Sequence, residues 1–120
     1  MKLFLYLFFC YPVAPETEVK DSSILVPFGG EVVLTCHVLS KSSDTMTWQR
    51  NGADIKLDYR HSISLIQMSV YRYTMSLVVH QMTKEDFGQY ACVAKNELGA
   101  SSSSIEVTGK NRSGSVVKNM

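Results

Sequence analysis

Two cysteines in segments of alternating hydrophobicity constrain this chain more than any other feature. Cys36 lies in EVVLTCHVL and Cys92 in GQYACVAK, and apolar residues recur at every second position of both segments. Because successive side chains of a β-strand point to opposite faces, this alternation is typical of strands that bury one face. The third cysteine, Cys10, lies in the apolar stretch LFLYLFFC, so the remaining even pair suggests a single disulfide, Cys36–Cys92.

This bridge would join two sheets across a shared core, because both cysteines face inward on their strands. It closes a loop with a sequence separation of 56 residues. Chain-entropy reasoning gives such a loop about 4 kcal/mol of stabilisation. That is a large share of the ~5–15 kcal/mol that stabilises a domain of this size. Since disulfides persist in oxidising compartments, the pair indicates a secreted or cell-surface protein.

The rest of the chain also reads as β-structure. The apolar residues follow a period of two, no window shows a sustained period of 3.6, and Gly, Pro, Asn, Asp and Ser clusters separate the runs. We interpret the serine run 101–104 as part of a strand with small inward positions, in phase with Ile105 and Val107. The predicted strands are 17–27 in two pieces, 31–39, 45–50, 54–57, 61–67, 72–80, 88–96 and 99–108.

The 120 residues are enough for one domain, which we place at 15–108. Residues 1–14 are either a secretory signal with a minimal apolar region or the product of a truncated or mis-joined coding region. Residues 109–120 are rich in Gly, Ser, Asn and Lys and are predicted to form a disordered tail or linker. Nothing near the C-terminus is hydrophobic enough for a membrane helix or lipid-anchor signal, so we expect membrane attachment only through an anchor absent from this chain.

The stretch EDFGQYAC, Glu85 to Cys92, predicts a structural corner. Tyr90 and Cys92 are two apart, so both face the core, and the tyrosine hydroxyl can bond back to the backbone. Asp86 can accept a hydrogen bond from the backbone N–H of Thr83, as in a capping box. We also predict that Arg60 pairs with Asp86. Gly88 permits a backbone geometry that larger residues resist.

Residues 28–108 resemble an immunoglobulin domain of the I-set type, an antiparallel β-sandwich. The motifs GGEVVLTCHV, MTWQRNG, YTMSLVV and TKEDFGQYACVAKNELG carry the resemblance. A Trp near the bridge and a Tyr two residues before the second Cys belong to the same signature. The resemblance therefore assigns Trp48, Leu77 and Tyr90 to the core.

The same motifs look like the third, membrane-proximal domain of insect neuronal adhesion receptors of the lachesin and Dpr-interacting-protein type. Such receptors have three immunoglobulin domains, a signal peptide and usually a lipid anchor. This sequence shows one domain and no anchor, so it looks like a fragment or an incomplete gene model.

The sequence offers little for catalysis or metal binding. His37, His61 and His80 lie on three different predicted strands, and no nucleophile-elbow motif is present. We therefore expect no enzymatic activity, no metal and no cofactor. A net charge of +1 also gives no field for gathering nucleic acid. The triplet NRS makes Asn111 the only N-glycosylation acceptor in the chain.

One sheet face is a candidate protein-contact surface. It would present Thr47 and Gln49 beside an exposed Val93 and Lys95, on a face whose groups are mostly small and uncharged. The alternative interpretation is that this face is only the solvated surface of a spacer domain. The resemblance implies a non-enzymatic adhesion or recognition module, extracellular or at the plasma membrane, whose partners are immunoglobulin-superfamily receptors on the same chain or another cell. Two alternatives stay open: a secreted single-domain binding protein and a domain of an intracellular muscle protein.

Overall fold

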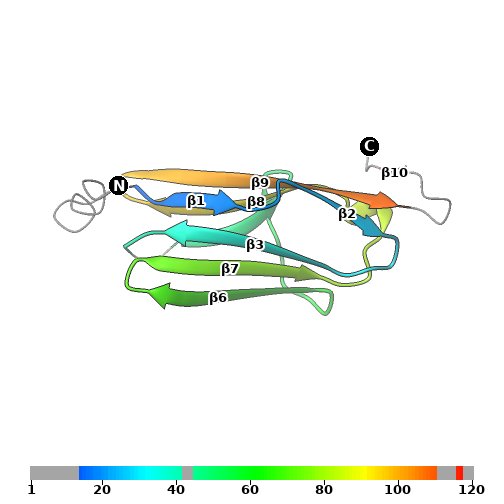
Figure 1. Ribbon diagram of the computed structural model, residues 1–120, viewed down its shortest axis with the longest axis horizontal. Helices are drawn as coiled ribbons and strands as arrows, with labels where there is room; N and C mark the ends of the chain where they lie inside the picture. Colours follow the sequence, from blue (N-terminus) through cyan, green and yellow to red (C-terminus); the bar gives the residue numbers. More distant parts are fainter. Residues whose placement is uncertain (1–13, 42–44, 111–115, 118–120) are drawn as a thin grey trace.

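Two β-sheets packed face to face make up the computed structural model, which describes residues 14–41, 45–110 and 116–117 (Figure 1). The first sheet has the order β1-β3-β7-β6 and the second β10-β9-β8-β4-β5, with β2 paired to β9. The elements are β1 (Glu16–Val19), β2 (Ser23–Pro27), β3 (Val32–Leu39), β4 (Thr45–Arg50), β5 (Ala53–Asp54), β6 (His61–Ser69), β7 (Arg72–Val79), the 3₁₀ helix η1 (Lys84–Asp86), β8 (Gly88–Asn96), β9 (Gly99–Lys110) and β10 (Val116–Val117).

The all-β sandwich predicted from the sequence is confirmed, with one refinement. Every neighbouring pair of strands is antiparallel among the described residues except β2 and β9, which run parallel. The region 17–27 forms two pieces, as predicted: β1 belongs to the first sheet and β2 pairs with β9 in the second. In the described part of the chain, no helix has the length and hydrophobicity needed to cross a membrane.

The core follows the alternation of the sequence. On β3, β7 and β8 the inward side chains are almost wholly buried, and their neighbours along each strand are more exposed, except Val93 on β8, which is also buried. Burial of these side chains at roughly 25 cal/mol per Å² drives the two sheets together. The core contains Val26, Val32, Leu34, Cys36, Val38, Trp48, Tyr73, Met75, Leu77, Val79, Met82, Phe87, Tyr90, Cys92, Ala94, Ile105 and Val107.

Two strand predictions need correction. The strand expected at 54–57 is only Ala53–Asp54, which pairs with Gln49 and Arg50 at the end of β4. The backbone N–H of Ile55 donates to the carbonyl oxygen of Trp48 at 3.1 Å, and its side chain packs against the core. The tail expected to be disordered is paired where it is described: β9 continues through Gly109 and Lys110, and β10 pairs with these two residues.

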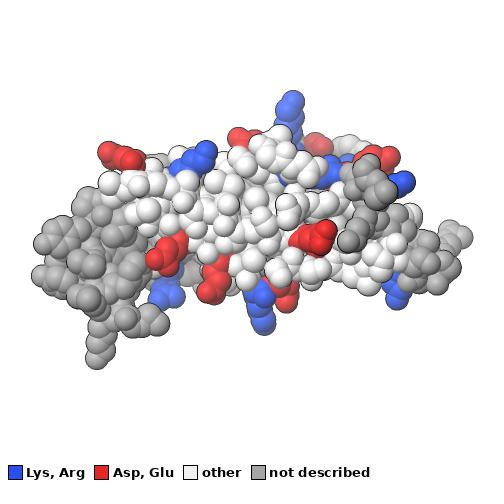
Figure 2. Space-filling model, turned by 90° about the horizontal axis from the view of Figure 1, so that it is seen from above, with Lys and Arg blue, Asp and Glu red and all other residues white. Residues whose placement is uncertain are grey.

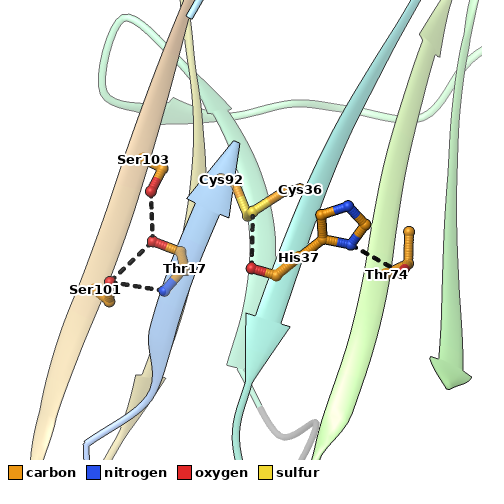
Figure 3. Close-up of a disulfide and its surroundings, with 7 residues drawn as sticks. All are labelled: Thr17, Cys36, His37, Thr74, Cys92, Ser101 and Ser103. Atoms are coloured by element: carbon orange, nitrogen blue, oxygen red, sulfur yellow. Dashed lines mark hydrogen bonds between the residues drawn. A yellow bond between two sulfur atoms is a disulfide. The ribbon is translucent and has the colours of Figure 1, made fainter. Parts of the chain in front are cut away.

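The serine run forms part of β9, as predicted, and it closes one edge of the sandwich. The hydroxyl of Thr17 on β1 lies 2.8 Å from the hydroxyls of both Ser101 and Ser103. The backbone N–H of Thr17 also donates to Ser101 at 3.1 Å. Figure 3 shows these bonds reaching from one sheet to the other, beside the disulfide. Small polar side chains therefore stand inward where β1 approaches β9.

We predict that the double variant Ser101→Ala/Ser103→Ala lowers the free energy of unfolding by about 1–2 kcal/mol, because Thr17 loses its partners at a half-buried position. Chemical denaturation monitored by tryptophan fluorescence measures the change. The matched control is Ser102→Ala/Ser104→Ala, on the exposed side of the same strand, which should change stability by less than about 0.5 kcal/mol. Equal losses in the two double variants would contradict a specific role for the inward pair.

Candidate functional site

The centre of the molecule is the disulfide predicted from the sequence. Cys36 on β3 and Cys92 on β8 are bonded, which links the two sheets. Trp48 lies directly beside Cys92 on the neighbouring strand β4, and Leu77 on β7 is fully buried. These residues fill the space between the sheets, so their role is to fix the distance between them.

The predicted corner also forms, around the carboxylate of Asp86. Arg60 donates from Nη1 and Nη2 to the two carboxylate oxygens, at 2.8 and 3.3 Å. The backbone N–H of Thr83 donates to the same carboxylate at 2.8 Å. Tyr90 donates its hydroxyl to the backbone carbonyl of Asp86. The predicted cap and the predicted Arg60–Asp86 pair are both present, and they tie the start of β6 to the turn before β8.

Burial and charge act on the ionisable groups of this corner in opposite directions. Burial acts to raise the pKa of Asp86, but the hydrogen bonds from Arg60 and Thr83 outweigh it, so the pKa lies below the ordinary value of 3.8. Burial raises the pKa of Tyr90 to about 12. Asp86 is thus held as an anion and Tyr90 as a neutral donor, which is the pattern of a structural network.

Arg50 belongs to this corner, and the sequence analysis did not identify it. Its guanidinium donates to the carbonyl oxygen of Phe87 at 3.1 Å and lies 5.8 Å from the centre of the Tyr90 ring. Its position in the sequence could have indicated this role: Arg50 follows Trp48 by two residues on the same strand, so both side chains lie on the inward face. Gly88 has a φ of +145°, a conformation that side chains with a Cβ rarely adopt, so its predicted role in the turn has a structural basis.

The three histidines lie apart, each with its own partner. The Nδ1 atom of His37 lies 3.2 Å from the hydroxyl oxygen of Thr74. The Nδ1 atom of His61 lies 2.8 Å from a carboxylate oxygen of Asp58, and that of His80 lies 3.0 Å from a carboxylate oxygen of Glu31. Within the described ranges, no group of three or more His, Cys, Asp and Glu side chains is arranged to hold a metal ion.

The candidate contact face of β4, β8 and β9 differs from the prediction at one residue. Val93, expected to be exposed, is only 7% exposed. It lies on the middle strand, between Thr47 on β4 and Ser102 on β9, and these flanking strands shield it. Thr47 and Gln49 are half-buried and Lys95 is exposed. Gln49 also donates to Asp54 at 3.0 Å, so Lys95 is the most accessible polar group of the four.

Charge does not single out a ligand site on the face that Figure 2 displays. Acidic and basic side chains alternate around a broad uncharged area there, with no large field of one sign among the described residues. The glycosylation acceptor Asn111 and residues 1–13 of the signal-like segment lie outside the described residues.

Comparisons with known proteins agree with this geometry. A family model described as an immunoglobulin domain matches residues 14–96. Hemicentin-1 of Mus musculus is 34% identical over 102 residues, which cover 83% of this chain but 2% of that protein. The chain therefore spans only a small part of this relative.

Two solved structures show the same architecture. A complex of Dpr2 Ig1-Ig2 with DIP-Theta Ig1-Ig3 contains a chain that is 24% identical, with a TM-score of 0.77 over 82% of this chain and 33% of that chain. A titin fragment of domains I67-I69 is 26% identical, with a TM-score of 0.73 over 84% of this chain and 34% of that chain.

We predict that Arg60→Ala lowers the free energy of unfolding by about 2 kcal/mol, because it leaves a nearly buried carboxylate without its main partner. The Asp86 side chain is 6% exposed, so water replaces the guanidinium poorly. Urea denaturation at neutral pH measures the loss. Arg72→Ala, which removes an exposed arginine at the start of β7, is the control and should cost less than about 0.5 kcal/mol. Wild-type stability in Arg60→Ala would refute the importance of this pair.

Stability should also fall in acid because of Asp86. Its folded-state pKa is lowered, so its contribution is complete above the unfolded value of 3.8 and is lost as the pH falls through the lower folded value. We predict that Asp86→Asn is less stable than the wild type at pH 7 and that this difference narrows below about pH 4. Denaturant midpoints between about pH 2 and 7 test this prediction, and two parallel curves would contradict it.

Proposed function

Because the chain belongs to the immunoglobulin-domain family, we propose that it is a non-enzymatic adhesion or recognition module of an extracellular or cell-surface protein. Its proposed role is that of a spacer or membrane-proximal domain that sets the distance and orientation of binding domains elsewhere. The sequence motifs that resemble lachesin-type and Dpr-interacting-protein-type receptors favour a neuronal setting.

The observation that carries this proposal is the cross-sheet disulfide, Cys36–Cys92. A disulfide buried in a small domain persists in oxidising compartments and is rare in the cytosol. The family match supports protein partners of the immunoglobulin type, on the same chain or on another cell. Asn111 fits the same setting as a glycosylation acceptor.

The path of the chain supports the spacer role. β1 begins at one end of the sandwich, and β9 finishes at the opposite end (Figure 1). β9 has 12 residues, so the module extends for about 40 Å along this strand. A rigid element that the chain enters at one end and leaves at the other is suited to holding neighbouring domains apart.

The second candidate function is that of an immunoglobulin domain in an intracellular muscle protein. The likeness to titin domains I67-I69 favours it. In that setting the two cysteines would be reduced and Asn111 would carry no glycan. A secreted single-domain binder remains the third candidate, and it depends on residues 1–14 acting as a signal.

Counting reactive thiols in the denatured but unreduced chain tests the proposal. We expect Cys36 and Cys92 to resist alkylation in the unfolded, unreduced protein, which leaves Cys10 as the one cysteine able to react. Mass spectrometry after alkylation in denaturant identifies the modified residues, and reduced protein, in which all three cysteines react, is the control. Alkylation of both Cys36 and Cys92 in chain isolated from its natural source would favour the intracellular candidate.

A further inference from the structure

The long edge strand β6 leaves one side of its sheet unpaired. It occupies the end of the order β1-β3-β7-β6 and, in the described part of the chain, pairs as a strand with β7 alone. Figure 1 shows it along the lower edge of the sandwich. The backbone N–H and C=O of His61 pair with Asp58, but from Ser62 onward β6 leaves backbone groups directed away from the sheet.

Apolar side chains accompany this free edge. Leu65 is 42% exposed, Ile66 56% and Met68 64%. Leu65 pairs with the buried Met75 and faces inward, yet it stays exposed. Because β1 and β9 meet at one side of the sandwich, β6 lies toward the same side as β5, and the two residues of β5 give it little cover.

β6 lacks most of the usual protection of a sheet edge. Edge strands in monomeric proteins are commonly protected by lysine, proline, an inward charge, a β-bulge or short length. From His61 to Ser69 the sequence HSISLIQMS contains no Lys, Arg, Asp, Glu or Pro. One bulge interrupts the pairing between Gln67 and Ser69 near the end of the strand, and the seven residues 61–67 keep a regular register with β7.

We propose that β6 is a self-association edge at which a second copy of this chain adds its own β6, in an antiparallel pair related by a two-fold axis. A two-fold contact brings the same surface of both copies together, so β6 of one copy would pair with β6 of the other. With no full charge between His61 and Ser69, two copies approach without like-charge repulsion between their strands. The exposed apolar side chains then pack across the pair.

We expect this dimer to be weak. One added strand pair buries less than the roughly 1,200–2,000 Å² typical of stable complexes. We expect a dissociation constant of about 10 µM to 1 mM, as for a weak, transient contact. The inference stands apart from the proposed function, because a strictly monomeric chain would leave the spacer role untouched.

Sedimentation equilibrium of the full chain tests the inference, with Cys10→Ser as the background so that a disulfide through this cysteine cannot imitate a dimer. The average mass should rise from 13.4 kDa toward twice that value as concentration increases. Ile66→Lys places a charge on the exposed side of the edge and should weaken the dimer at least about tenfold. Ser64→Lys is a second edge variant that removes no apolar side chain, and it should act in the same direction.

The matched control is Val33→Lys. Val33 is 54% exposed, β-branched and on the outward face of the same sheet, but it lies on β3, two strands from the edge. This variant should dimerise as the wild type does. Amide exchange within residues 61–69 should slow as the wild-type concentration rises, which locates the contact.

Three results would overturn the inference. One is a wild-type chain that stays monomeric up to about 1 mM, the weakest affinity expected here. Another is a dimer that survives both edge variants, or that Val33→Lys weakens equally, when circular dichroism shows all variants folded. The third is a dimer whose formation leaves amide exchange in β6 unchanged.

Discussion

The bond between Cys36 and Cys92 fixes the distance between the two sheets, and much else depends on this distance. It holds β3 of one sheet against β8 of the other. Since the side-chain period of a strand is two, an inward cysteine sets the inward phase of its whole strand. The hydrogen-bonded registers then transfer this phase to the neighbours: Cys36 pairs with Met75 on β7, and Cys92 pairs with Trp48 on β4. The inward residues of these paired strands together form the buried core.

Polar groups close the sandwich at its margins, where the apolar core gives out. At one margin Thr17 bonds to Ser101 and Ser103, and at another Arg60 holds Asp86 beneath the Tyr90 hydroxyl. The magnitudes order these contributions: about 4 kcal/mol for the disulfide loop, about 2 for the ion pair and about 1 for a single hydrogen bond. The side chains of Thr17, Arg60 and Asp86 have hydrogen-bond partners at these margins, whereas the buried Nε of Arg50 at the second margin has none.

The sequence predicted what depends on local periodicity and missed what depends on neighbours. Alternation placed β3, β4, β7 and β8 nearly to the residue, and the spacing of Asp86 from Thr83 anticipated the capped turn. Alternation gives the face of a residue but not the strands beside it, so the parallel partner of β2 and the shielding of Val93 were not foreseeable. The composition of the tail likewise said nothing of the pairing that holds β10 to β9.

Among the described strands, β6 is the sheet edge best suited to self-association. β2 pairs with residues 106–110 of β9, and the part before them is held to β1 by the bonds of Ser101 and Ser103 to Thr17. β1 has only four residues and is tied to β9 through Thr17. β5 has two residues, too few to template a partner. That leaves β6, which is long, contains no Lys, Arg, Asp or Glu and exposes Leu65, Ile66 and Met68, as the edge where backbone pairing and side-chain packing act together.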